Sequence, residues 1–291
     1  MTPVSIAGLL FAAVLHAIWN LLAKRGSDNQ LFLISAAAMA AVFIAPLALV
    51  RATRGASLPS GVWPVILISG TLEALYYLLL GQAYRTGDLS LVYPISRGSS
   101  PLFVTLFALI FEGERIALIG AIGIFLTVVG IYVVHLKSFV PQALLEPVRT
   151  IATSRTSQLA LLTGATIAGY SVADKAGVAL MDPVLYFFLV LVVSGALLAP
   201  YVLTKRRAAL WSEWQKNWRA IIMVGVTIGF GYLLILFILT TNKVSYATSV
   251  RTASVVFGAA LGALVLKEPI GKKVVGACVI FAGIICIGLA N

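Results

Sequence analysis

Charged side chains are scarce in this sequence: they make up 11% of its 291 residues, whereas 60% are hydrophobic. A soluble domain carries about 25% charged residues, so this scarcity excludes a soluble globular fold, and the apolar content excludes an intrinsically disordered chain. Cysteine is scarce too. Cys278 and Cys286 fall in one apolar run, spaced for neither a zinc site nor a disulfide framework, and we expect buried, unreactive thiols.

Long apolar runs occupy most of the chain. A transmembrane helix needs about 20 apolar residues to cross roughly 30 Å of hydrocarbon. Barrel strands would alternate apolar and polar residues over about ten positions, and these runs do not. We therefore predict an all-α polytopic membrane protein with ten transmembrane helices, the first retained because no Lys or Arg precedes it as in a signal peptide. Seven runs are free of charge and three carry one interior charge: 1–23, 29–50, 116–136, 156–173, 183–204, 220–242 and 274–291, then 62–84, 89–111 and 244–266.

The two halves of the chain repeat one another at a shift of 154 residues. This shift aligns Arg251 with Arg97 and Glu268 with Glu114, so each half has an intramembrane arginine followed 17 residues later by a glutamate. Because five helices is an odd number, the second half must enter the membrane from the opposite face. This predicts two inverted five-helix repeats with a substrate site at their interface. The predicted units are a repeat at 1–136, a connecting cytoplasmic loop at 137–155 and a repeat at 156–291.

Basic residues are unevenly divided between the predicted loops. The chain has 21 basic and 10 acidic residues, a formal net charge of +11. When each loop is numbered by the helix it follows, the odd loops hold fourteen Lys and Arg residues and the even loops hold five. Because cytoplasmic loops are enriched in Lys and Arg, we expect the odd loops in the cytoplasm and both termini in the periplasm.

One junction between predicted helices carries a specific motif. The stretch Tyr93-Pro94-Ile95-Ser96-Arg97-Gly98, then Pro101 and a Gly113-Glu114-Arg115 helix start, resembles EamA-type proteins of the drug/metabolite transporter superfamily. In the second half Ala247-Thr248 replaces Tyr-Pro, and only Arg251 and Glu268 correspond. The resemblance implies an inner-membrane carrier of small metabolites, often an exporter, with amino acids and their analogues among its substrates.

Charges inside the predicted helices are candidates for the mechanism. A charge at the bilayer centre costs about 2.5 kcal/mol or more, which favours a partner or a wet cavity. We expect the helices of Glu73 and Arg97 to form a tight antiparallel pair. The two side chains then either form a structural salt bridge or have a functional role. In the functional role, Glu73 exchanges protons or Arg97 releases Glu73 to bind a substrate carboxylate. Arg251 either binds an anionic group, pairs with Asp174 near the outer end of its helix, or caps carbonyls and reaches outward.

Deep aromatic and amide side chains complete the candidate substrate site, because their polar tips need partners inside a membrane. His16, one turn from Trp19, is either bonded to a neighbouring helix or coupled to protons. The candidate substrate-binding residues are Trp19, Asn20, Glu73, Tyr76, Tyr77, Tyr93, Arg97, Tyr170, Tyr232 and Arg251.

Proline and glycine suggest where the bundle bends and where it packs. Pro94, Gly98 and Pro101 in one helix make it the candidate gate, although static kinks are equally compatible with them. Small-residue ladders suit close helix packing, and we interpret their two helices as scaffold or a dimer face. These ladders are Gly120, Gly123 and Gly130 in one helix and Gly276, Gly283 and Gly288 in the other.

Together these features predict a secondary transporter. We expect it to export amino acids or related carboxylate-bearing compounds, aromatic ones included, across the inner membrane by alternating access. A lipid-handling flippase and a multidrug efflux pump of the same superfamily stay open as alternatives. A membrane-embedded enzyme is disfavoured, because no zinc or magnesium motif accompanies the two histidines, His16 and His135. We expect no catalytic residue, metal, cofactor or nucleic acid. The expected partners are a small-molecule substrate, the lipid bilayer and a coupling proton, with the chain a monomer or homodimer.

Overall fold

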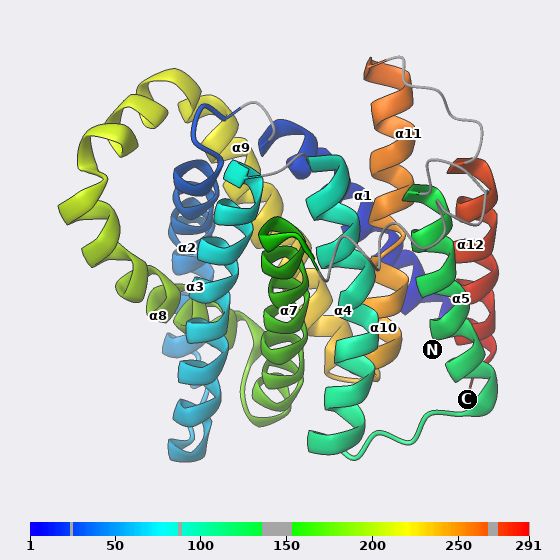
Figure 1. Ribbon diagram of the computed structural model, residues 1–291. Coiled ribbons are helices and arrows are strands. Elements are labelled where there is room, and N and C mark those ends of the chain that lie inside the picture. The colour runs from blue at the N-terminus through cyan, green and yellow to red at the C-terminus, as the bar shows by residue number, and fades with distance from the viewer. Residues whose placement is uncertain (24–25, 87–88, 136–152, 267–272, 291) are drawn as a thin grey trace.

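The computed structural model describes residues 1–23, 26–86, 89–135, 153–266 and 273–290 (Figure 1). Most of the predicted loop at 137–155 and Glu268 lie outside the described residues. All regular structure in the described part is helical. The helices are α1 (Pro3–Ala23), α2 (Asn29–Thr53), the 3-10 turn η1 (Ser60–Val62), α3 (Trp63–Thr86), α4 (Leu89–Phe111), α5 (Leu118–His135), α7 (Arg155–Leu180), α8 (Pro183–Lys205), α9 (Arg207–Leu239), α10 (Val244–Arg251), α11 (Ser254–Leu266) and α12 (Lys273–Leu289).

The predicted ten-span, all-α membrane fold is confirmed. Each predicted run contains one helix, except the ninth, which is divided between α10 and α11. Among the described residues, α1, α2, α3, α8 and α9 are long and apolar enough to cross a bilayer, and α4, α5 and α12 hold shorter apolar stretches. α7 is more polar because it carries Asp174, Lys175 and several hydroxyl groups.

The two repeats run through the bundle in opposite senses. In Figure 1, α1, α3, α5, α8 and α11 end at the upper side, whereas α2, α4, α7, α9 and α12 end at the lower side. The first repeat therefore starts at the lower side and the second at the upper side. Opposite starting faces are the defining feature of inverted repeats.

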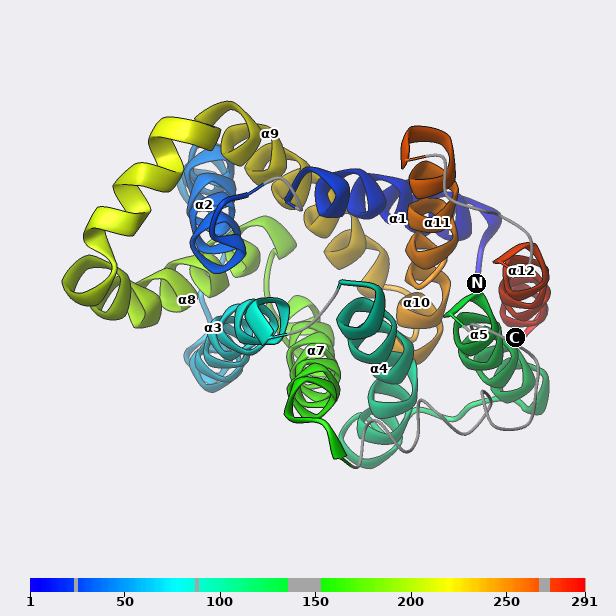
Figure 2. The ribbon, with the colours of Figure 1, turned by 45° about the horizontal axis from the view of Figure 1, so that its top comes forward.

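Helix contacts follow the symmetry between the repeats. α7 of the second repeat packs against α3 and α4 of the first, and α1 packs in the equivalent way against α9 and the α10–α11 pair. Figure 2 shows α7 between α3 and α4, and α1 between α9 and α11. The first helix of each repeat is thus inserted into the other repeat, which buries polar residues of α1 and α7 at the centre of the molecule.

The expected tight pairing of the Glu73 and Arg97 helices is wrong, because α7 separates α3 from α4. A short connection constrains only the helix ends that it joins. α7 fits between them because two of its glycines allow close approach. A Cβ atom at Gly164 would lie 2.9 Å from the Ser96 carbonyl oxygen of α4, and one at Gly169 would lie 2.8 Å from Leu72 Cδ1 of α3.

The glycine ladders of α5 and α12 pack against each other within the chain. A Cβ atom at Gly123 would lie 2.7 Å from the Gly283 carbonyl oxygen, and one at Gly130 would lie 2.8 Å from the Gly276 carbonyl oxygen. Such backbone contact is the usual role of small residues between membrane helices. Of the two interpretations of these faces, the structure therefore supports the scaffold.

Loop 7, expected at residues 205–219, is largely helical, because α9 begins at Arg207 and continues for 33 residues. Two contacts hold this polar extension against the start of α2. The buried Glu213 carboxylate accepts the backbone N–H groups of Ser27 and Asp28, at 3.2 and 2.9 Å. The Trp214 indole donates to Ser35 Oγ at 3.0 Å. These tertiary hydrogen bonds satisfy the Glu213 carboxylate, one of the charges that made the segment look like a loop.

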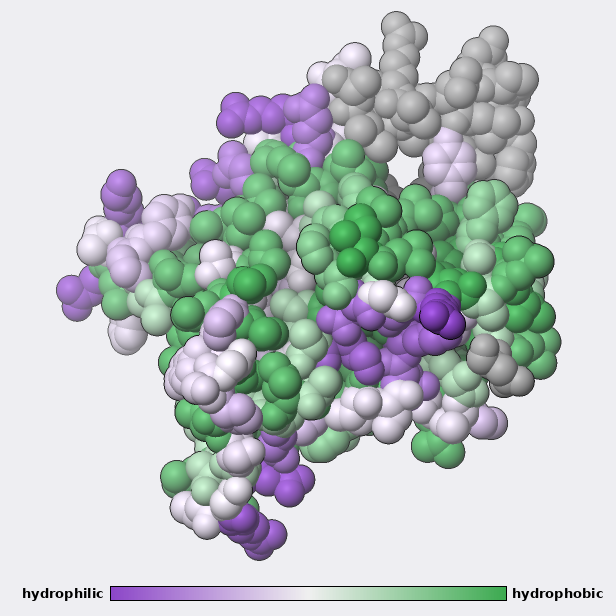
Figure 3. All heavy atoms as spheres, turned by 90° about the horizontal axis from the view of Figure 1, so that it is seen from below, coloured by the Kyte–Doolittle hydropathy of each residue, from purple (hydrophilic) through white to green (hydrophobic). Residues whose placement is uncertain are grey.

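The outer flanks of the molecule are apolar, as lipid contact requires. Figure 3, which views the lower side, shows hydrophobic residues over much of the periphery, a hydrophilic cluster near the middle, and further hydrophilic residues that protrude at the left and lower edges. Phe111 and Leu118, at the lower ends of α4 and α5, are 72% and 79% exposed. The expected burial of both cysteines is wrong, because Cys278 is exposed on α12 and Cys286 is only half-buried. A thiol behaves as a small apolar group and is tolerated at such a surface.

Candidate functional site

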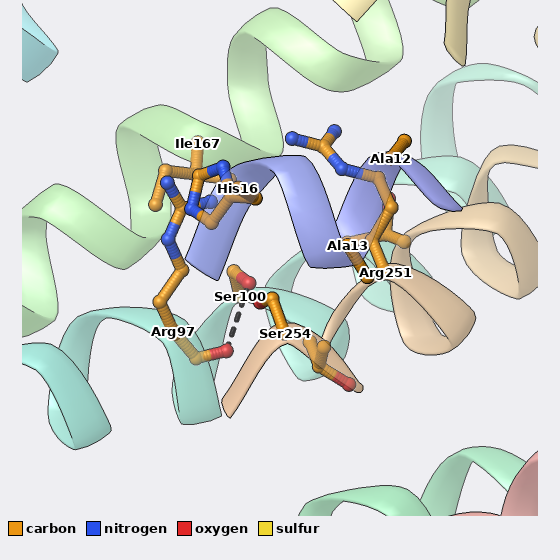
Figure 4. Close-up of a pocket in the computed structure, with 10 residues that line it drawn as sticks. Ala12, Ala13, His16, Arg97, Ser100, Ile167, Arg251 and Ser254 are labelled. Atoms are coloured by element: carbon orange, nitrogen blue, oxygen red, sulfur yellow. Dashed lines mark hydrogen bonds between the residues drawn. The ribbon is translucent and has the colours of Figure 1, made fainter. Parts of the chain in front are cut away.

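The two symmetry-related arginines lie at one cavity in the centre of the bundle. Arg97 of α4 and Arg251 of α10 both line it, together with His16 of α1 (Figure 4). Arg97 is buried and Arg251 half-buried. The cavity has room for about one water molecule. The remaining lining residues are small, apolar or hydroxyl-bearing: Ala12, Ala13, Ser100, Ile167, Thr248, Thr252 and Ser254.

The backbone differs between the two repeats beside these arginines. α4 is helical throughout, including Gly98 and Pro101. Its counterpart breaks immediately after Arg251, where Thr252 and Ala253 separate α10 from α11. Interrupted helices at the centre of a bundle are typical of transporter binding sites. The interruption places Arg251 at a helix end, and the gating role of Pro94, Gly98 and Pro101 stays a prediction.

Four predicted tyrosines form a continuous row of rings behind the cavity. Ring centroids are separated by 5.1 Å from Tyr77 to Tyr76, 5.9 Å from Tyr76 to Tyr170 and 6.2 Å from Tyr170 to Tyr232. All three contacts have the edge-to-face geometry that aromatic rings prefer. The row crosses from α3 through α7 to α9, so both repeats contribute to it. The side chain of Tyr93 lies outside the described residues.

Each arginine of the cavity contacts one ring of this row. The Arg97 guanidinium donates to Tyr76 Oη at 3.2 Å and lies 6.0 Å from the ring centroid. Arg251 Cζ lies 5.3 Å from the Tyr232 centroid. Both distances fall within the range of cation–π attraction. The aromatic row therefore supports both cations.

Asp174 is held by hydroxyl groups from three other helices. Its carboxylate accepts Ser69 Oγ at 2.5 Å and Tyr186 Oη at 2.9 Å, and also accepts the Tyr232 hydroxyl. Only 1% of the residue is exposed. The alternatives in which Asp174 pairs directly with Arg251 or faces solvent are therefore not realised. The carboxylate reaches Arg251 only through Tyr232, because hydroxyls of α3, α8 and α9 occupy its oxygens.

Glu73 and Arg97 do not form the predicted salt bridge: the Arg97 guanidinium donates instead to Tyr76, on the same helix as Glu73. Ion pairs in the described part of the chain join Arg51 to Asp182 and Arg206 to Asp28. Glu73 Oε1 accepts one long hydrogen bond from Tyr77 Oη, at 3.4 Å. Its Oε2 atom is buried without a partner among the described residues. Glu73 is thus much less well solvated by hydrogen bonds than Asp174.

Trp19 and Asn20 donate hydrogen bonds to His16 and are not among the residues that line the cavity. The Trp19 indole donates to His16 Nδ1 at 3.0 Å, and Asn20 Nδ2 donates to the His16 carbonyl oxygen at 2.8 Å. His16 therefore bonds within its own helix and not, as one alternative held, to a neighbouring one. Sequence reasoning left His16 out of the substrate site. The available signal was its spacing of three residues from Trp19, which places both side chains on one helix face.

Metal binding finds no support in this region. Across the described residues, no group of three His, Cys, Asp or Glu side chains is arranged to hold a metal ion. The described residues that line the cavity include one imidazole, that of His16, and no Asp, Glu or Cys.

Comparisons with known proteins agree with this architecture. The model of the EamA-like transporter family matches residues 4–136 and 155–289, one match for each half. A solved crystal structure of another protein shares the fold at 18% identity, with a TM-score of 0.72 over 98% of this chain and 96% of that chain. Curated proteins give no match. Because the family model spans both five-helix halves, the chain belongs to the EamA-like transporter family and is a multi-pass membrane transporter.

Proposed function

We propose that the protein is a secondary transporter that exports small carboxylate-bearing metabolites, amino acids and aromatic compounds included. The observation that carries this proposal is the meeting of Arg97 and Arg251, one from each repeat, at a single cavity. A guanidinium offers paired N–H donors that match a carboxylate. The cavity lies at the repeat interface, where alternating access exposes a site to each face in turn.

The cation-rich cavity also bears on the alternatives. A multidrug pump for organic cations needs an accessible acid, and the described lining residues include two arginines and no Asp or Glu. Like charges would repel such a substrate by several kcal/mol in a low-dielectric site. A flippase needs a lateral path for lipid headgroups, and the residues that line the cavity come from α1, α4, α7, α10 and α11, helices of both repeats.

Counterflow in proteoliposomes tests the proposal. Purified protein is reconstituted and preloaded with one unlabelled compound from a panel of amino acids, nucleosides and phosphorylated metabolites, and entry of the labelled compound is followed. We expect exchange of a carboxylate-bearing compound, absent from protein-free vesicles and strongly reduced in Arg251→Ala. Exchange of organic cations alone, or scrambling of labelled lipid, would favour the pump or the flippase instead.

We further propose that Glu73 carries a coupling proton. An ionised carboxylate with one buried, unpartnered oxygen is expensive in an apolar setting, and Glu73 is in that position. Asp174, with three hydroxyl donors, is the better solvated of the two acids. Among the described residues, Tyr77 hydrogen-bonds Glu73, and the ion pairs Arg51–Asp182 and Arg206–Asp28 do not include Glu73.

The orientation is proposed from loop charge, with the upper side of Figure 1 in the cytoplasm and both termini in the periplasm of an inner membrane. In a background of Cys278→Ser and Cys286→Ser, a membrane-impermeant maleimide should label Thr2→Cys in intact cells. Ala208→Cys, exposed at the start of α9, should need permeabilisation and is the matched control. The reverse pattern would invert the proposed topology.

A further inference from the structure

The hydrogen-bond donors around the central cavity differ in whether their hydrogens already bind an acceptor within the protein. Ser100 Oγ donates to the Arg97 carbonyl oxygen at 3.0 Å, and Thr252 Oγ1 donates to the Ser249 carbonyl oxygen at 2.5 Å. These hydroxyl hydrogens are therefore bound to the backbone. The guanidinium groups of Arg97 and Arg251 supply the cationic donors at the cavity, on opposite sides of it in Figure 4.

His16 adds a third donor, and Trp19 determines which of its nitrogens donates. An indole N–H can only donate a hydrogen bond, so His16 Nδ1, 3.0 Å from Trp19 Nε1, must accept with its lone pair. The proton of the neutral imidazole therefore sits on Nε2. That atom is buried and has no partner among the described residues, and His16 lines the cavity beside Arg97 (Figure 4).

We infer that His16, Arg97 and Arg251 form one oxyanion-binding subsite, in which the His16 Nε2–H group is the third ligand and Trp19 is a positioning residue. The inference rests on the proposed transport function and deepens it, because it names the substrate group that the cavity binds. Since the cavity has room for about one water molecule here, the surrounding helices must move apart to admit a whole substrate. Three donors without a carboxylate among the described lining residues suit an anion and reject a cation. A carboxylate and a phosphate group share this chemistry.

Binding to purified, detergent-solubilised protein tests the subsite independently of transport. Benzoate and inorganic phosphate are the probes, tetraethylammonium is the cationic control, and binding is measured by calorimetry. We expect at least one oxyanion to bind, and the one that binds identifies the carboxylate or the phosphate class. Binding of neither oxyanion, or equal binding of tetraethylammonium, would overturn the inference.

Variants separate the ligands from the positioning residue. Arg97→Lys and Arg251→Lys should each weaken oxyanion binding about tenfold, because the bidentate fork is lost while the charge is kept. Trp19→Phe keeps an aromatic ring but removes the donor that selects the tautomer. It should weaken binding about three- to tenfold, the usual effect of one hydrogen bond. Trp218→Phe, at an exposed indole on α9, is the matched control and should bind as wild type.

A conservative substitution distinguishes the proposed role of His16 from a structural one. His16→Gln retains an N–H donor and should bind more tightly than His16→Phe, with both variants melting near the wild-type temperature without ligand. Equal affinity of these two variants, or wild-type affinity in Trp19→Phe, would refute the third ligand. Oxyanion binding without any counterflow would leave the subsite supported and refute transport alone. Counterflow of a substrate that has no oxyanion would refute both the subsite and the proposed substrate class, while transport itself would stand.

Discussion

Replacing Gly130 with valine is expected to destabilise the protein by about 1–3 kcal/mol, the usual cost of overpacking a tight interface. A Cβ atom there would lie 2.7 Å from Ile280 N and 2.8 Å from the Gly276 carbonyl oxygen. Both are backbone atoms, so no rotamer change relieves the clash and α5 must move away from α12. Membrane helices gain little hydrophobic energy from association, so the lost contact is not replaced.

The measurement is the melting temperature of purified protein in detergent, with the folded yield from membranes as a second readout. Gly195→Val is the matched control, because Gly195 also lies within a helix but a Cβ atom there meets nothing within 4 Å. A large drop for Gly130→Val with little change for Gly195→Val is the expected pair of results. Equal melting temperatures would show that the α5–α12 contact contributes little to stability.

Replacing Glu73 with glutamine is expected to abolish the response of transport to a pH gradient while counterflow at equal pH persists. Glutamine keeps the shape of Glu73 and the acceptor for Tyr77 Oη but carries no exchangeable acidic proton. The arginines at the cavity are unchanged, so substrate exchange retains its ligands. The measurement is uptake into proteoliposomes with and without an imposed pH gradient.

Glu112→Gln is a stringent control for this prediction. Glu112 follows the end of α4, and partial burial raises the pKa of its carboxyl group, although Lys175 lowers it. It is therefore another acid with an increased tendency to hold a proton, but away from the central cavity. We expect its glutamine variant to respond to the gradient as wild type. A gradient response retained in Glu73→Gln would remove Glu73 from the coupling mechanism.

Several features of the candidate site were predictable from the sequence. The shift of 154 residues aligns Arg97 with Arg251, and both line one cavity because inverted repeats place equivalent positions around a common axis. The tyrosines at 76, 77, 170 and 232 were all predicted as candidate substrate-binding residues, and they form one row. Intramembrane polar side chains need partners, and this need brings them together.

Other features depended on which helices are neighbours. Similar depth suggested a pair between Glu73 and Arg97, but depth is measured along a helix and says nothing of what lies beside it. α7 packs against both helices, and the Arg97 guanidinium donates to Tyr76 of α3 and not to Glu73 on the same helix. Position along the helix also could not predict the partners of Asp174, because its three hydroxyl donors come from three other helices, α3, α8 and α9.

The sequence by itself determined the membrane environment, the ten spans and the internal repeat, because these follow from local hydrophobicity and from residue spacing along one chain. The tertiary structure alone decided that each repeat inserts its first helix into the other, that the helix of Arg251 breaks while that of Arg97 continues, and that His16 lines the same cavity as both arginines. Lateral packing between apolar helices depends on the shapes of both partners, set here by glycines such as Gly164. Hydropathy does not record that complementarity.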